Sequence, residues 1–212
     1  MQNLANDVVG GINSYIAEQQ KQELPSLITL IQFHSSEPQQ VIFDAQPIKH
    51  TRPLGPDDYR PGGRTPLYDA IGATVRRAEK NSRAEKENVV IIIFSDGEEN
   101  SSRRDNQFTV TKMIEEKKEE GWAFVFMGAN IDAFAEASKA GIDRQSTQNF
   151  VPDSEGVKAA FGSISGASIQ YSRTMSKKAS SKRERVEEAS RIMNDFQEAE
   201  EDWEQRNGFN DL

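Results

Sequence analysis

A continuous apolar run, Val89 to Phe94, ends directly at Ser95-Asp96-Gly97. Its length and its β-branched residues predict a strand that is buried on both faces, as strands of parallel sheets are. Ligand sites of such sheets lie beyond the carboxyl ends of the strands, which is where Asp96 falls. Upstream, the segment Gly62-Gly63-Arg64-Thr65-Pro66 places the Thr65 hydroxyl in a glycine-rich loop. Because hydroxyl and carboxylate oxygens suit hard divalent cations, we expect Thr65 and Asp96 to meet in a metal site.

The composition excludes several classes of function. Of the 212 residues 35% are hydrophobic, which is enough for one core. A formal net charge of -8 argues against a nucleic-acid or anionic-membrane partner. The absence of cysteine excludes disulfides and thiolate zinc sites and is typical of a reducing compartment. No segment reaches the roughly 20 apolar residues of a membrane span, and the N-terminus does not resemble a signal peptide, so we expect a cytoplasmic protein.

The apolar periodicity predicts alternating helices and strands. Helices are expected over residues 3–20, 66–80, 107–120, 132–140 and 154–169, and strands over 27–33, 41–43, 89–94, 122–127 and 146–150. The first two strands are expected to form an antiparallel hairpin at one edge of the sheet, and residues 51–64 an irregular loop. The alternation predicts a three-layer α/β fold, with a doubly wound, mostly parallel sheet and helices on both faces. Gly10 and Gly11, inside the first helix, predict a close backbone approach to that sheet.

The composition changes near residue 172. Residues 1–171 are expected to form one domain, and residues 172–212 a charged amphipathic helical tail, because basic and then glutamate-rich segments follow one another there. The tail either packs on the domain or stands in solvent, and self-association is the alternative.

Two segments resemble the metal-ion-dependent adhesion site (MIDAS) of von Willebrand factor A (vWA) domains. Residues 62–71 look like the family's threonine segment and residues 93–100 like its aspartate segment, while residues 122–130 resemble a strand and turn of the small stand-alone bacterial and phage members. The resemblance covers residues 1 to about 171. It implies a Rossmann-like fold and non-enzymatic protein binding, in which Mg²⁺ or Mn²⁺ held by Thr65 and Asp96 accepts an acidic residue of a protein partner.

The chain departs from the vWA pattern at its beginning. In the family an Asp-x-Ser-x-Ser motif ends the central first strand, but this motif is absent here, and Met1-Gln2-Asn3-Leu4 looks like the junction that follows it. By this alignment the central strand and most metal-coordinating positions are missing, so we expect an incomplete adhesion site with weak or absent cation binding. Three explanations compete: a mis-set or alternative translational start, which we favour, a degenerate protein, or a fragment completed by another chain.

Several residues around the expected site have a second interpretation. Arg64, Tyr68, Glu98, Glu99 and Asn100 are candidates for partner binding, and the simpler alternative is that the acidic loop is merely solvated. Thr65 before Pro66 is also a suitable helix N-cap. Asp96-Gly97 is a common hairpin turn, although the loop and helix that follow disfavour a hairpin.

Two other functions remain open. The first is a metal-independent scaffold or inhibitory protein that acts through its sheet edges or its tail. The second is a nucleotide- or metal-dependent enzyme of doubly wound fold. This function is less expected, because neither a Gly-x-Gly-x-x-Gly nor a Walker-type phosphate loop occurs. The sequence leaves the oligomeric state open.

Overall fold

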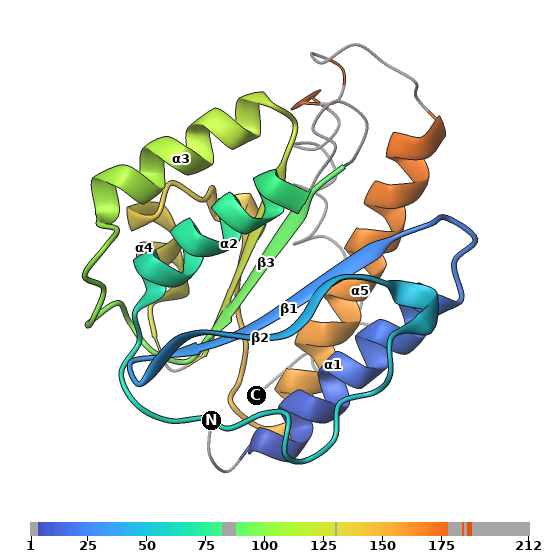
Figure 1. Ribbon diagram of the computed structural model, residues 1–212, viewed down its shortest axis with the longest axis horizontal. Coiled ribbons are helices and arrows are strands. Elements are labelled where there is room, and N and C mark those ends of the chain that lie inside the picture. Colours follow the sequence, from blue (N-terminus) through green and yellow to red (C-terminus); the bar gives the residue numbers. More distant parts are fainter. Residues whose placement is uncertain (1–3, 82–87, 130, 178–183, 185, 188–212) are drawn as a thin grey trace, which may run out of the picture.

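The computed structural model describes residues 4–81, 88–129, 131–177, 184 and 186–187 (Figure 1). The helices are α1 (Ala5–Gln20), α2 (Leu67–Asn81), α3 (Gln107–Glu119), α4 (Ala133–Lys139) and α5 (Ser154–Lys177). The strands are β1 (Leu27–His34), β2 (Glu37–Pro47), β3 (Val90–Ser95), β4 (Ala123–Gly128) and β5 (Thr147–Asn149). The described elements confirm the expected α/β class and the alternation of helices and strands.

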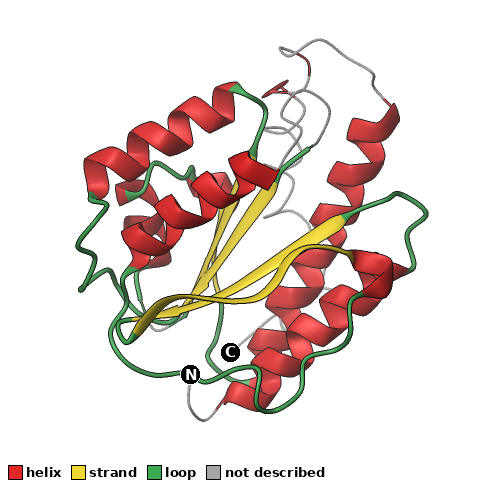
Figure 2. Cartoon of the chain, in the orientation of Figure 1, coloured by secondary structure: helices red, strands yellow, loops and turns green. Residues whose placement is uncertain are grey.

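The strands form two sheets rather than one (Figure 2). Strands β3, β4 and β5 form a parallel sheet in that order, and β1 pairs with β2 as an antiparallel hairpin. The hairpin was expected from the sequence, but its place at the edge of a single sheet was not correct, because β1 and β2 make a separate two-stranded sheet. As a result β1 and β3 are both edge strands.

Helices cover both faces of the parallel sheet. Side chains of α1 and α5 pack on one face, against Val125 and Met127, while α2, α3 and α4 pack on the other, against Phe124 and Phe126. All residues of β4 are buried, because this strand is paired on both sides and covered on both faces. A smaller core beneath the hairpin contains Ile16, Phe43, Ile48 and Leu54. Within the described residues, no helix combines the length and apolarity needed to cross a membrane.

Helices α1 and α5 approach each other closely at Gly11. A Cβ atom added to Gly11 would lie only 2.2 Å from the Phe161 ring, whereas one added to Gly10 would meet nothing within 4 Å. The prediction that both glycines approach the sheet was therefore wrong. Gly11 serves a contact between two helices, and Gly10 faces open space.

Helix α5 extends beyond the end expected at residue 169 and crosses the expected boundary after residue 171. Tyr171 and Met175 belong to the core, and the Tyr171 hydroxyl donates a hydrogen bond to the Gly121 carbonyl at 3.2 Å. Packing on the domain thus continues to at least Met175. Most of the expected tail, including residues 188–212, lies outside the described residues.

The two adjacent glycines give a matched test of this packing. Gly11→Ala is expected to lower the free energy of unfolding by about 1–3 kcal/mol, because the added methyl group overlaps the Phe161 ring. Gly10→Ala is expected to raise it by about 0.5–1 kcal/mol, because alanine favours the helix and meets no neighbour. Urea unfolding of both variants measures the difference. If the two substitutions change stability in the same direction, the close packing of α1 on α5 at Gly11 is contradicted.

Candidate functional site

The structure brings the loop containing Thr65 against the turn that follows β3. A Cβ atom on Gly97 would lie 2.4 Å from Thr65 Oγ1, so this approach requires glycine at position 97. The Thr65 amide donates a hydrogen bond to Asn100 Oδ1 at 2.9 Å, and the Asn100 amide donates one to the Thr65 carbonyl at 3.1 Å. Thr65 and Asp96 also line the same cavity. Thr65 and Asp96, which are distant in sequence, therefore border one crevice.

The first turn of α2 is capped by the loop after β3. The Tyr68 amide donates to Glu99 Oε2 at 2.9 Å, and the Asp69 amide donates to Ser102 Oγ at 3.0 Å. A carboxylate at this position also interacts favourably with the helix dipole. The hydrogen bonds of the described residues therefore assign the capping role to Glu99 and Ser102, where the sequence had offered Thr65.

Asp69 binds the same loop in the opposite direction. Its carboxylate accepts hydrogen bonds from the amides of Arg103, Arg104 and Asp105 at 2.8–2.9 Å. Burial acts to raise the pKa of Asp69, but these amide hydrogen bonds outweigh it and lower the pKa below its ordinary value. Two carboxylates, one from each segment, thus hold α2 and the loop after β3 together.

Glu99 is a structural residue of this loop. Besides the Tyr68 amide, it accepts hydrogen bonds from the Ser101 and Ser102 amides and from the Ser102 hydroxyl. Burial acts to raise its pKa, and the hydrogen bonds from Ser102, Tyr68 and Ser101 reverse the effect and lower it. The Glu99 amide itself donates to the buried Glu136 carboxylate at 3.2 Å.

The remaining candidates for partner binding lie around the crevice. Arg64 is exposed, and its amide donates to Ser35 Oγ at 2.9 Å while its carbonyl accepts from the Ser35 amide. Glu98 and Asn100 are exposed, and Tyr68 is half-buried. Burial, with the nearby charges of Glu136 and Glu99, raises the pKa of Tyr68. Of the five candidates, Glu99 and Asn100 use their side chains within the loop scaffold.

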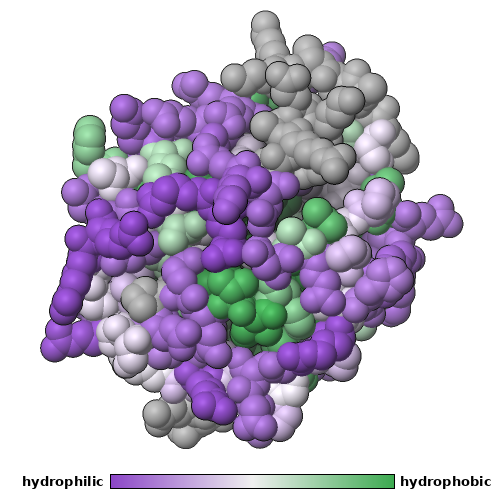
Figure 3. Space-filling model, in the orientation of Figure 1, coloured by the Kyte–Doolittle hydropathy of each residue, from purple (hydrophilic) through white to green (hydrophobic). Residues whose placement is uncertain are grey.

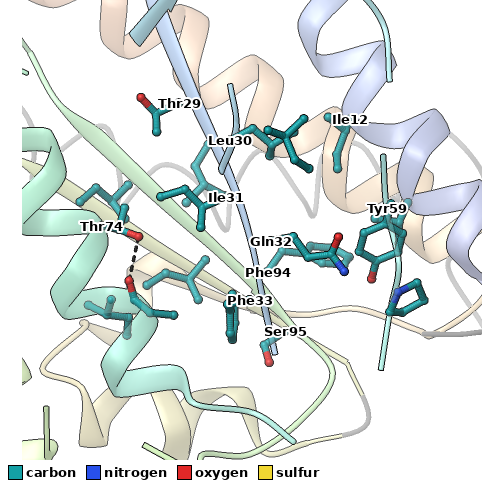
Figure 4. A pocket seen from close by; sticks show the side chains of 18 of the residues that line it. Ile12, Thr29, Leu30, Ile31, Gln32, Phe33, Tyr59, Thr74, Phe94 and Ser95 are labelled. Carbon is teal, nitrogen blue, oxygen red and sulfur yellow. Dashed lines mark hydrogen bonds between the residues drawn. The ribbon is translucent and has the colours of Figure 1, made fainter. Parts of the chain in front are cut away.

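Tyr59 is a residue of the crevice that the sequence did not reveal. It comes from the irregular loop over residues 51–64, and its ring lines the same cavity (Figure 4). Burial, together with the charge of Asp96, raises the pKa of Tyr59 to about 12. The Tyr59 hydroxyl is therefore protonated at neutral pH and available as a hydrogen-bond donor near Asp96. A lone aromatic in a proline-rich loop carries no sequence signal of this placement.

The cavity has a volume of about 610 Å³ and runs between β1 and β3. It is lined by residues 27–33 of β1, by all of β3 and the Asp96 that follows it, and by apolar side chains of α1, α2 and α5 (Figure 4). Tyr59, Thr65 and Asp96 are among its polar lining residues. An apolar cavity of this size with a few polar groups is typical of a binding site.

The oxygen atoms of the crevice are of the kind that binds a hard cation, but there are few of them. Among the described residues, no group of three or more His, Cys, Asp or Glu side chains is placed to hold a metal ion. Asp96 and Thr65 offer one carboxylate and one hydroxyl, whereas Mg²⁺ prefers about six oxygen ligands. Further ligands would have to come from water or from another chain.

No protein-family model and no curated protein matches this sequence. The fold and the crevice alone therefore define the class, an α/β protein with a polar crevice beside the carboxyl end of a parallel strand.

The Asp69 clamp predicts a pH-dependent loss of stability. Asp69→Asn is expected to lower the free energy of unfolding by about 1–3 kcal/mol at pH 7, because an amide cannot replace a carboxylate that accepts three N–H groups. The folded pKa of Asp69 is lowered, so its contribution is complete above the ordinary value near 4 and is lost as the pH falls through the folded pKa.

Urea unfolding between pH 7 and pH 2 measures this difference, with Asp57→Asn, at an exposed carboxylate in the 51–64 loop, as the control. The wild type and Asp69→Asn should converge at the acid end, while Asp57→Asn should follow the wild type throughout. If the difference in the free energy of unfolding between the wild type and Asp69→Asn stays constant with pH, the ionised Asp69 carboxylate does not hold the loop as described.

Proposed function

We propose that this chain is a non-enzymatic protein-interaction module of vWA type, with an incomplete metal-ion-dependent adhesion site at Thr65 and Asp96. Mg²⁺ or Mn²⁺ binds there weakly or not at all in the isolated chain, and an acidic residue of a protein partner completes the coordination. The observation that carries this proposal is the contact between the Thr65 hydroxyl and the turn after β3, with Asp96 in the same crevice.

The polar groups of the crevice support ligand binding. The Tyr59 phenol, with its pKa raised to about 12, is a hydrogen-bond donor and not a base at neutral pH. Asp96 and Thr65 are acceptors that a cation can join, and a partner carboxylate is both a further oxygen ligand and a second negative charge. Binding of the cation and binding of the partner stabilise each other, so each ligand raises the affinity for the other by the same factor.

The placement of the ligand residues supports a rigid site. Thr65 is held by Asn100, and the flanking segments are held by the carboxylates of Glu99 and Asp69. Preorganised ligands lose little conformational entropy on binding, so few protein ligands still suffice for a weak site.

A second candidate function is metal-independent binding through sheet edges. The observation in its favour is that the edge strands β1 and β3 border one apolar cavity. Partner binding that persists in excess chelator would favour this candidate over the metal-dependent one.

The metal site is tested by Mn²⁺ binding to the full chain, followed by water-proton relaxation. We expect a dissociation constant on the order of 1 mM or weaker. Asp96→Asn and Thr65→Val should each weaken binding by about 10-fold, because each removes one of the few protein ligands. Glu98→Gln, an exposed carboxylate in the same loop, should leave it unchanged.

Tight Mn²⁺ binding that Asp96→Asn leaves intact would falsify the assignment of Asp96. An equal loss in Glu98→Gln would show that Mn²⁺ responds only to the acidity of the loop.

A further inference from the structure

We propose that the cavity between β1 and β3 receives an extended apolar peptide strand from a separate polypeptide. The peptide pairs with both edge strands and joins the two sheets into one. This inference goes beyond the metal site, because the pairing needs no cation.

The lining of the cavity shows that it follows the main-chain edges of the two strands. Every residue of the stretches 27–33 and 90–96 borders it. Side chains of a strand alternate between the two faces of a sheet, so a cavity on one face would be bordered by alternate residues only. Here consecutive residues of both strands border the cavity. The cavity therefore lies beside the strands, in the plane where a further strand would lie.

The hydrogen bonds of β3 identify the groups that point into this space. The Val89 carbonyl accepts from the Ala123 amide and the Ser95 carbonyl from the Ala129 amide, so the odd-numbered residues of β3 face β4. In a parallel ladder the N–H and C=O groups of one residue point to the same side, and successive residues alternate. Val90, Ile92 and Phe94 therefore direct their main-chain groups toward the cavity.

The two edges run in the same direction. Ser35, just after β1, exchanges hydrogen bonds with Arg64, and Gly97, just after β3, contacts Thr65. The carboxyl ends of both strands therefore meet at the 64–65 loop, as the ribbon also shows (Figure 1). A single inserted strand can thus pair in the same sense with both neighbours.

The walls of the cavity specify an apolar occupant. Val8, Ile12 and Phe161 border it from α1 and α5, and Leu67 and Ile71 border it from α2, on the opposite side of the sheet. Both faces of an inserted strand would therefore meet apolar side chains. The occupant should resemble β4, which is apolar and buried along its whole length.

The exposure of β3 is consistent with an unfilled neighbouring position. Val90, Ile92 and Phe94 are only half-buried, although β3 lies between helical layers and β4 beside it is fully buried. An inserted strand would remove these half-buried side chains from water. Apolar residues also gather over the hairpin, near the centre of the face seen in Figure 3.

A separate polypeptide is the occupant that costs this chain least. Within the part of the chain that the structure describes, β1 to β5 are each already paired in a sheet, so a second copy would have to release one of these strands in order to donate it. A peptide that is extended and unpaired beforehand loses no such ladder. This mode of recognition, in which a peptide adds a strand to a sheet edge, takes its affinity from main-chain hydrogen bonds.

The probe is a fluorescent synthetic peptide, Lys-Lys-Ala-Phe-Val-Phe-Met-Gly, which copies β4 behind two solubilising lysines. Binding to the full chain is followed by fluorescence anisotropy in excess chelator. The matched control is the same peptide with N-methyl groups on three alternate residues, which removes hydrogen-bond donors while the apolar side chains remain. We expect one-to-one binding of the unmodified peptide and at least 10-fold weaker binding of the methylated one.

Hydrogen exchange followed by NMR tests the position of the peptide. The amides of Val90, Ile92 and Phe94 should gain protection when the peptide binds, whereas those of Ile91 and Ile93 should change little, because they already face β4. A uniform gain along β3 would indicate general stabilisation without edge pairing and would overturn the proposal.

A blocking variant tests the cavity itself. Thr74→Trp places a large ring in the cavity from α2 and should abolish binding, while Lys80→Trp, exposed on the same helix, should not. If Thr74→Trp does not fold, the methylated peptide still decides the question.

Equal binding of both peptides would show that the cavity binds apolar side chains without main-chain pairing, and this would overturn the proposal. A dimer of the unliganded chain with Val90, Ile92 and Phe94 already protected would make a second copy the occupant and overturn the choice of a separate polypeptide. Because chelator is present throughout, loss of peptide binding in this experiment is distinct from failure of the metal site.

Discussion

The pairing of β3 with β4 is the interaction on which the rest of this structure depends. Its register aligns Val90–Ser95 with Ala123–Gly128, so that β4 is buried on all sides and helices can cover both faces. The ladder continues to the Ser95 carbonyl, which accepts from the Ala129 amide, so Asp96 is the first residue released from it. The same pairing turns alternate main-chain groups of β3 away from β4. The position of the carboxylate and the open sheet edge are therefore two consequences of one ladder.

The loops at the carboxyl end of β3 are positioned by carboxylates that accept backbone amides. Glu99 caps α2, and Asp69 at the start of α2 accepts three amides from the loop that carries Glu99. Charged acceptors make stronger hydrogen bonds than neutral ones, and each is fully effective only while ionised. Thr65 is placed by this framework and by Asn100. The crevice thus depends on acidic residues that are not themselves directed at a ligand.

Local signals in the sequence were sufficient for the elements but not for their assembly. The β-branched run before Ser95 and the helical spacing after Pro66 predicted β3 and α2 correctly, because both patterns reflect burial. No local pattern encodes the separation of the hairpin from the parallel sheet, since it depends on long-range pairing. Only the missing central strand, expected from the resemblance to vWA domains, pointed to a gap in the sheet. Helix α5 was predicted to end near residue 169, because the composition becomes charged from Ser172 onward, although Tyr171 and Met175 continue the apolar spacing of the helix.

The candidate site shows the same limit. Thr65 and Asp96 were singled out by residue type and by their place at loop ends, and the structure brings their segments together. The structural use of Glu99 and the placement of Tyr59 near Asp96 depend on how a long loop folds back, which no local pattern encodes. Because Asp96 borders the cavity at the carboxyl end of β3, a strand running parallel to β3 would end beside it. A carboxylate at that end of the strand would add an oxygen ligand, so by linkage the strand and the cation would strengthen each other's binding by one common factor.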